Sequence, residues 1–238
     1  MRVLGVETAT GQGGVAVVGP EGLLAEVTLS VTAGYAERLL PALERLLAVA
    51  DIRPETLDGY AISIGPGSFT GLRIGLAWAK GVCFAAPMKL VLVSAHEATA
   101  HRHRHAGPLL VTLFPGERGE AQVALWSGGE RVSLRFGPER VSEDALADVL
   151  RGAFSGALPA AAGAATYAIH VAAPDLKPSV REALLQSGCR LLDGEGAAPL
   201  AAAVAALGDR ELLAGNAADL TAAAPFYGRA PNARRPGT

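Results

Sequence analysis

Short apolar runs, separated by glycine and proline, open the chain. Residues 2–7, 15–18 and 23–29 are three such runs, and the turn residues between them predict a meander of three strands. Two later runs, residues 59–64 and 90–93, predict two further strands. The N-terminal part of the chain is therefore expected to contain five strands.

Helical patterns lie between and after these strands. Leucines recur at three- and four-residue spacing over residues 35–47, with charged side chains on the other face, which predicts an amphipathic helix. Ser68 is a favourable N-cap for a second helix that runs to about Ala85. Ser94 is placed to cap a third helix over about residues 95–105.

The same order of elements starts again after Pro108. This second round is expected to contain strands at residues 109–113, 121–127, 131–136, 157–161, 167–171 and 190–192, and helices at about residues 142–150, 181–186 and 199–207. A repeated order of three strands, a helix and a strand is the ground plan of the actin-like ATPase fold, which sugar kinases, heat-shock ATPases and ribonuclease H-like proteins share. We therefore predict a duplicated α/β fold of this type with a degenerate second half.

The chain divides on this basis into residues 1–106 and residues 107–238, with an irregular tail from about residue 225. Half of the residues are apolar and 18% are charged, which is a globular composition and excludes a disordered chain. The net charge of −2 provides no overall basic field, so contact with RNA would need a local patch or a partner. Neither the first residues nor the alanine-rich stretch at 157–174 resembles a signal peptide or a membrane span, so we expect a cytoplasmic protein without membrane contact.

The first hairpin carries residue types that bind phosphate in the predicted fold. There, a carboxylate at the end of the first strand holds the metal and the turn that follows cradles the phosphate. Glu7, Thr8, Thr10 and Gly11 stand in that place and are candidates for a vestigial nucleotide site. The second hairpin, residues 113–116, offers a proline without an N–H and no acid, so we expect no independent ATPase activity and no cofactor, with ATP or ADP at a partner interface as the alternative.

Residues 65–75, Gly-Pro-Gly-Ser-Phe-Thr-Gly-Leu-Arg-Ile-Gly, are the most distinctive segment of the chain. No Gly-Lys-Ser/Thr follows, so the segment is not a P-loop, and it lacks dinucleotide-binding spacing. Its glycines permit tight backbone where a strand turns into a helix. Two interpretations stay open, which are a helix start packed closely on the sheet and an anion site at the helix N-terminus.

Residues 64–81 resemble the signature of the bacterial TsaB (YeaZ) family. Residues 3–10 resemble that family's first strand, with Glu7 where Asp is usual, and residues 37–41 resemble its Glu-Arg-Leu-Leu-Pro helix, with Tyr35-Ala36 where His-Ser is usual. Weaker matches are found at residues 93–97, 118–120 and 225–231. The resemblance is strongest in the first hundred or so residues and thinner beyond them.

The resemblance implies a non-catalytic scaffold subunit. Members of this family dock onto a catalytic paralogue, TsaD, and an ATPase, TsaE, joins them to transfer a threonylcarbamoyl group to the adenosine beside the tRNA anticodon. The catalytic relative holds metal with a His-x-x-x-His pair, and Ala95 and Thr99 stand in the matching places here, so no catalytic residue and no metal site are expected. The tRNA would be met indirectly, through the complex. A metal-dependent glycoprotease-like peptidase and an ATP-binding regulatory subunit are the alternatives.

The apolar faces of the first two helices suggest the docking surface. The apolar side chains of the second helix cover a wider part of its surface than one packing contact requires. One apolar face can therefore pack on the sheet, and another can bind a partner. The same surface would form a homodimer when the chain is alone. The alternative is that the apolar stripes of both helices belong to the protein's own core. The predicted interface residues are Tyr35, Glu37, Arg38, Leu39, Leu43, Leu46, Leu47, Phe69, Leu72, Arg73, Leu76 and Lys80.

Five remaining side chains have candidate chemistry. Cys83 and Cys189 fit no metal spacing and are expected to be buried, inert thiols. His101 and His105 are four residues apart and would share a helix face, with His103 between them, but no third ligand lies nearby. We expect a solvated helix end there, with a metal site or an anion or RNA contact as alternatives.

Overall fold

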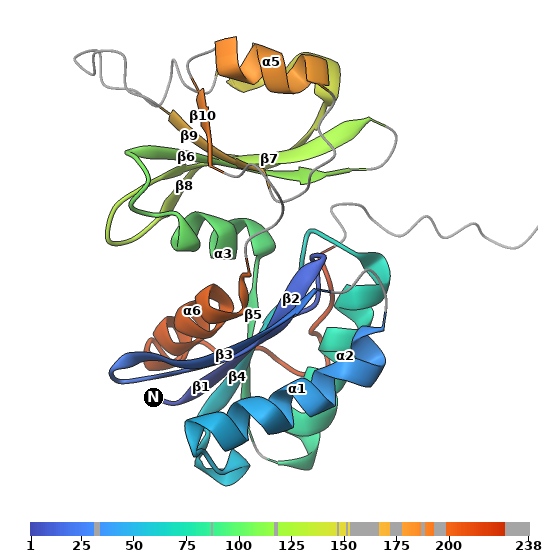
Figure 1. Ribbon diagram of the computed structural model, residues 1–238, viewed down its shortest axis with the longest axis vertical. Coiled ribbons are helices and arrows are strands. Elements are labelled where there is room, and N and C mark those ends of the chain that lie inside the picture. Colours follow the sequence, from blue (N-terminus) through green and yellow to red (C-terminus); the bar gives the residue numbers. More distant parts are fainter. Residues whose placement is uncertain are drawn as a thin grey trace, which may run out of the picture.

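A computed structural model describes residues 1–30, 34–86, 88–116, 119–146, 148–150, 152, 167–171, 178–186, 189–192 and 199–226. Two five-stranded sheets form the molecule, and the helices α3 (Ala95–Arg102) and α6 (Ala201–Leu213) lie between them (Figure 1). Within the described part of the chain, no helix is both long enough and apolar enough to cross a membrane.

The first sheet has the strand order β3-β2-β1-β4-β5. The strands β1 (Val3–Glu7), β2 (Gln12–Gly19) and β3 (Gly22–Ser30) form the predicted antiparallel meander. The strands β4 (Gly59–Ser63) and β5 (Lys89–Val93) extend the sheet in parallel with β1. All five strands expected in this part of the chain are confirmed.

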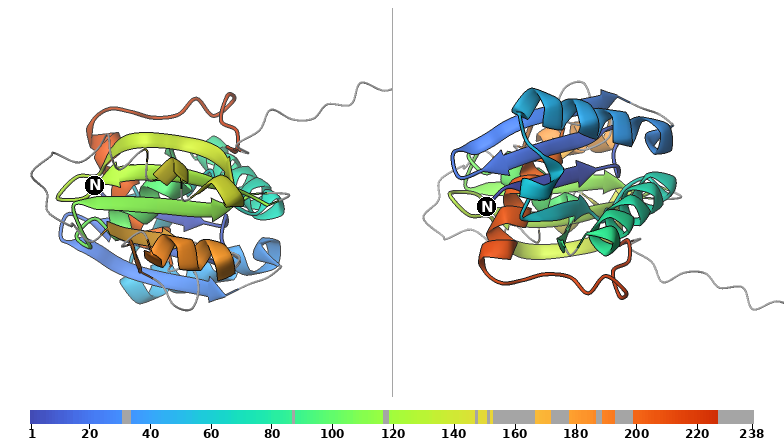
Figure 2. Two further views of the ribbon diagram at one scale, coloured as in Figure 1. Left: turned by 90° about the horizontal axis from the view of Figure 1, so that it is seen from above. Right: turned by 90° about the horizontal axis from the view of Figure 1, so that it is seen from below.

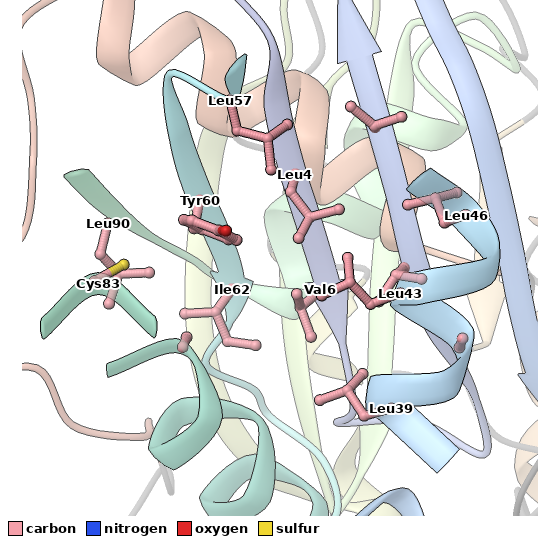
Figure 3. Close-up of a cluster of buried hydrophobic side chains, with 14 of the residues drawn as sticks. Leu4, Val6, Leu39, Leu43, Leu46, Leu57, Tyr60, Ile62, Cys83 and Leu90 are labelled. Carbon is pink, nitrogen blue, oxygen red and sulfur yellow. The ribbon is translucent and has the colours of Figure 1, made fainter. Parts of the chain in front are cut away.

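Two helices cover one face of the first sheet, as the two views of Figure 2 show. The first is α1 (Tyr35–Ala50), and the second is α2 (Phe69–Ala85), which Ser68 caps as predicted. Because side chains alternate along a strand, Leu4 and Val6 of β1 point to this face. Figure 3 shows the leucine stripe of α1 packed against them, in the largest hydrophobic core of the described residues.

The helix α6 covers the opposite face of the first sheet, although it comes from the C-terminal part of the chain. Gly208 lets it approach closely, because a Cβ there would lie 2.3 Å from the Cβ of Ala61. The amide N–H of Ala202, in the first turn of α6, donates to the carboxylate of Glu26 on β3 (3.2 Å). A division at residue 106 therefore separates the two sheets but assigns α6 to the sheet on which it does not pack.

The second sheet repeats the first, in the order β10-β9-β6-β7-β8. The strands β6 (Leu109–Pro115), β7 (Glu120–Ser127) and β8 (Ser133–Ser142) form an antiparallel meander. The strand β9 (Tyr167–Val171) runs parallel to β6, and β10 (Cys189–Leu191) runs parallel to β9. The repeated topology confirms the predicted duplicated fold, and the three-residue β10 fits its degenerate second half.

Helices cover both faces of the second sheet. The helix α5 (Pro178–Gln186) and the helical residues 146 and 148–150 pack on one face through Leu184, Leu146 and Leu150. The other face packs on α3, where Ala100 joins a cluster built by the sheet. Two one-turn 3₁₀ helices, η1 (Pro54–Thr56) and η2 (Glu143–Ala145), complete the described elements.

Some element boundaries differ from those that the sequence predicted. The strand β8 begins at Ser133 rather than residue 131, and its pairing with β7 is interrupted by two register shifts. The helix α3 ends at Arg102 rather than about His105, because the chain turns at His103, whose N–H donates to the carbonyl of Thr99 (3.2 Å). The predicted strand at residues 157–161 and most of the predicted irregular tail lie outside the described residues.

Candidate functional site

The β1–β2 turn holds the candidate nucleotide residues, and Glu7 is its centre. The Glu7 side chain is fully buried, and its Oε1 accepts the N–H groups of Ala9 (2.5 Å) and Thr10 (2.9 Å). Burial raises the pKa of the Glu7 carboxyl, while the Ser63 hydroxyl and these two amides act in the opposite direction. The carboxyl thus binds the turn of its own chain.

Tyr35 fixes the other side of the same turn. Its hydroxyl accepts the N–H of Gly13 (2.8 Å) and donates to the carbonyl of Thr10 (2.6 Å). Only 5% of the residue is exposed, and burial raises its pKa to about 12. Tyr35 was predicted at the partner interface, and that prediction is wrong because its side chain points into the protein.

The glycine-rich segment 65–75 packs directly on this turn. A Cβ at Gly67 would lie 2.2 Å from the carbonyl oxygen of Ala9, and a Cβ at Gly71 would lie 1.9 Å from that of Thr8. The N–H of Ser68 donates to the Ala9 carbonyl (2.7 Å), and the Ser68 hydroxyl accepts the N–H of Gly71. These contacts agree with the close-packing interpretation, because any side chain at either glycine would push α2 off the turn.

The four candidate nucleotide residues therefore occupy different environments. Glu7, Thr8 and Thr10 are buried, and only Gly11 is exposed. The amides of the turn that the structure pairs are bound to side chains of the same chain. These residue types are suited to binding phosphate. The paired backbone N–H groups of the turn, however, already donate to side chains of the same chain.

The first strand of the second half, β6, has its buried polar network at the middle of the strand. The hydroxyl of Thr112 lies 2.7 Å from Nδ1 of His96 and accepts the indole N–H of Trp126 (3.0 Å). The His96 ring also meets Phe114 edge to face, with ring centroids 4.7 Å apart. Burial lowers the pKa of His96 to about 3, so the ring is neutral at pH 7. This network joins α3 to the second sheet.

The two positions that the family resemblance aligns with a metal-binding histidine pair lie on α3. Ala95 and Thr99 are both fully buried, and neither side chain is a usual metal ligand. Nowhere in the described ranges do three His, Cys, Asp or Glu side chains gather as a metal ion would need. Glu97, on the same helix, forms an ion pair with Arg210 of α6 (2.7 Å). The polar groups of this helix thus join structural elements.

The histidine run at the end of α3 is not a shared helix face. His105 lies beyond the last helical residue and is exposed. Burial, with a smaller effect of Arg104, lowers the pKa of His101 to about 4, and burial and Arg102 lower that of His103 to about 4. The expected solvated position is therefore found for His105, whereas His101 and His103 are partly buried. Cys83 is buried as expected, and burial raises its pKa to about 11, whereas the Cys189 side chain lies outside the described residues.

Most of the apolar residues predicted to dock a partner lie in the protein's own core. The sheet takes up the whole leucine stripe of α1 and the matching stripe of α2, as an amphipathic helix on a sheet requires. We therefore correct the predicted interface at six further positions, each at most 9% exposed, which are Leu39, Leu43, Leu46, Leu47, Leu72 and Leu76.

The polar members of the predicted interface are on the outer side of the helices. Glu37 and Arg38 of α1 are exposed, as are Phe69 and Arg73 of α2, and Lys80 is partly exposed. The guanidinium of Arg73 lies over the Phe69 ring, 3.7 Å from its centroid. Such a contact holds both side chains in place at an exposed site.

Three large apolar residues of these helices are exposed although the sequence analysis did not select them. Leu40 is 52% exposed, Val49 is 74% exposed and Phe84 is 88% exposed. Each lies outside the apolar stripe that faces the sheet. An apolar residue at a helix position outside the periodic stripe is therefore the sequence signal that could have identified them. Together with Phe69, which is 54% exposed, they are the exposed large apolar residues of α1 and α2, and we refer to these four side chains as the outer face.

The family model described as TsaD, tRNA N6-adenosine threonylcarbamoyltransferase, matches residues 22–148, which is more than half of the chain. The tRNA threonylcarbamoyladenosine biosynthesis protein TsaB of Bacillus subtilis strain 168 is 29% identical over 126 residues, which are 53% of this chain and 55% of the relative. The TsaB protein of Escherichia coli strain K12 is 32% identical over 153 residues, covering 60% of this chain and 65% of the relative. The chain thus spans about half the length of the first of these relatives.

Solved structures show the same fold over nearly the whole chain. YeaZ from Pseudomonas aeruginosa superposes with a TM-score of 0.74 at 19% identity, over 95% of this chain and 99% of that chain. A second Pseudomonas aeruginosa protein, described as similar to peptidase YEAZ, gives a TM-score of 0.75 at 18% identity, over 96% and 99% of the two chains. The chain therefore belongs to the family that the TsaD model describes, as one of its TsaB (YeaZ) members.

Proposed function

We propose that this chain takes part in threonylcarbamoyladenosine biosynthesis as a non-catalytic subunit that docks onto a TsaD-like catalytic relative. The observation that carries this proposal is the outer face, where Leu40, Val49, Phe69 and Phe84 expose large apolar side chains on two adjacent helices. Large apolar side chains that remain exposed on the protein are available for burial by a partner. The TsaB names of the relatives supply the pathway.

The arrangement of the two helices suits docking. Both begin at the β1–β2 turn, α1 through the Tyr35 hydroxyl and α2 through the N–H of Ser68. Leu40 and Phe69 consequently lie toward one end of the pair, and Val49 and Phe84 toward the other. A second helix pair laid across this surface would contact apolar groups at both ends and complete a four-helix interface.

Charged side chains are exposed on the same two helices as the apolar groups of the outer face. Arg38 and Arg73 are exposed and positive, and Glu37 and Glu44 are exposed and negative. A mixed polar rim around an apolar centre is the usual composition of a non-obligate interface. A homodimer through the same face is the proposed state of the chain without its partner.

The chemistry of the interior supports a role without catalysis. Ala95 and Thr99 replace the histidine pair of the catalytic relatives, and the strand-end carboxyl of Glu7 binds its own turn. A TsaE-like ATPase and the tRNA would then meet this chain only within the complex.

Reconstituted threonylcarbamoyl transfer tests the proposal. With the TsaD-like and TsaE-like partners present, we expect Leu40→Asp or Phe84→Asp to weaken binding of the chain to its TsaD-like partner by at least about tenfold and to reduce transfer in parallel. Leu213→Asp is the matched control, because Leu213 is 67% exposed at the end of α6, away from the outer face. Equal binding by all three variants would contradict the docking assignment.

A further inference from the structure

We infer that the β1–β2 turn is a closed anion-binding site whose ligand is the carboxyl group of Glu7. The class of external ligand that it would accept is a small carboxylate, such as formate or acetate, and only when the Glu7 carboxyl is removed. This inference concerns the isolated chain and does not depend on the proposed function.

Two backbone donors of the turn converge on one oxygen atom. The N–H groups of Ala9 and Thr10 both point at a single oxygen, Oε1 of Glu7, at 2.5 and 2.9 Å. Neighbouring N–H groups aimed at one point form the concave donor site that binds anions in many proteins. Here a side chain of the same chain supplies the oxygen that an anion would otherwise bring.

Further backbone groups of the turn are also bound within the chain. The Tyr35 hydroxyl accepts the N–H of Gly13 and donates to the Thr10 carbonyl, so it binds a donor and an acceptor at once. The Ala9 carbonyl accepts the N–H of Ser68. Side chains and α2 therefore hold the turn in shape, and the bonds that define it need no external ligand.

The carboxyl group lies in a buried part of the protein. Glu7 is fully buried, and α2 covers the turn so closely that Gly67 and Gly71 have no room for a Cβ. A buried acceptor oxygen is costly to remove, because the two amides would lose their partner in a place that water reaches poorly. The carboxyl of Glu7 is thus required for stability, and its loss creates a cavity with two donors.

Chemical rescue tests this inference on the purified protein. Glu7→Ala deletes one methylene group and the carboxyl, and we expect its Tm to fall by roughly 5–10 °C. Millimolar formate should restore part of that loss in Glu7→Ala and leave the Tm of the wild-type protein unchanged. A formate effect of the same size in both proteins, or none in a folded Glu7→Ala variant, would overturn the inference.

Glu7→Gln is the matched control, because its amide oxygen can still accept both N–H groups. This variant should fold and keep a Tm closer to the wild-type value. Formate should leave its Tm unchanged. Should Glu7→Ala fail to fold, hydrogen exchange of the Ala9 and Thr10 amides decides the question. Slow exchange in the anion-free wild-type protein supports the closed site, whereas fast exchange that inorganic phosphate slows would show an open one.

Discussion

The first strands of the two halves, β1 and β6, are each associated with a buried titratable side chain, and the two side chains have opposite chemistry. At the end of β1, an acid is buried and its pKa is raised. In the middle of β6, Thr112 bonds a buried histidine whose pKa is lowered to about 3. Both groups favour their neutral forms, because burial disfavours charge of either sign. The comparison teaches that both buried groups, an acid and a base, bind other groups of their own chain.

The largest expected effect comes from the second half. Thr112→Val removes the hydroxyl that His96 and Trp126 share, and both ring nitrogens then lose a buried partner. At about 2 kcal/mol for each unsatisfied group, the free energy of unfolding should fall by about 4 kcal/mol. Denaturant unfolding measures this loss, and Thr112→Ser, which keeps the hydroxyl, is the control. A loss below about 1 kcal/mol would show that the network is not what holds α3 to the second sheet.

Acid should weaken the protein through His96. Its folded-state pKa of about 3 lies below the ordinary value of 6.5, so the unfolded chain binds more protons between these values. The stability that the neutral ring contributes is complete above pH 6.5 and is lost as the pH falls toward 3. We expect a loss of about 3 kcal/mol at pH 4 from this group.

Unfolding free energies measured against pH in the wild-type protein and in His96→Asn isolate this effect. Asparagine keeps a polar group near the Nδ1 position but does not titrate. His101 and His103 act in the same direction and are present in both proteins. Identical pH profiles would contradict the assignment of the acid effect to His96.

Tyr35→Phe should have a smaller effect, at the first strand end. The change leaves the Gly13 N–H and the Thr10 carbonyl without the hydroxyl but keeps the ring in the core. We expect a loss of about 1–2 kcal/mol in unfolding free energy and faster exchange of the Gly13 amide. Unchanged protection of that amide would mean that Tyr35 does not secure the turn.

The smallest expected effect is a change in how the free energy of unfolding depends on pH, and it comes from Glu7 in the first half. The raised pKa of Glu7 means that the folded chain holds its proton more tightly than the unfolded chain, whose value is near 4.5. The contribution is therefore complete below pH 4.5 and is lost as the pH rises, which is opposite in sign to that of His96. Glu7→Gln should gain stability relative to the wild-type protein as the pH rises above 4.5. A constant difference across the pH range would contradict a raised pKa.

The sequence predicted the architecture well because turn residues mark its elements. Glycine and proline separate the strands of both meanders, and Ser68 and Ser94 cap the helices that they were expected to cap. The exact start of β8 was not predictable, because a register shift depends on pairing with β7 rather than on local composition.

The candidate site was predicted only in part. Periodicity finds the apolar stripe of a helix but does not say whether a sheet or a partner covers it, so Leu39 was placed at the interface and the neighbouring Leu40 was not selected. Glu7 was identified as chemically capable, but its bonds to the next residues are a matter of three-dimensional geometry. Tyr35 reaches a turn 22 residues earlier in the sequence, which no local pattern reports.

The most direct test of the central claim is threonylcarbamoyl transfer to tRNA, measured with the TsaD-like and TsaE-like partners in the presence and absence of this chain. We predict that transfer needs the chain, that Glu7→Gln supports transfer as well as the wild-type protein does, and that Leu40→Asp does not. Transfer at an equal rate without the chain, or its loss in Glu7→Gln with Leu40→Asp fully active, would contradict a subunit that works by docking.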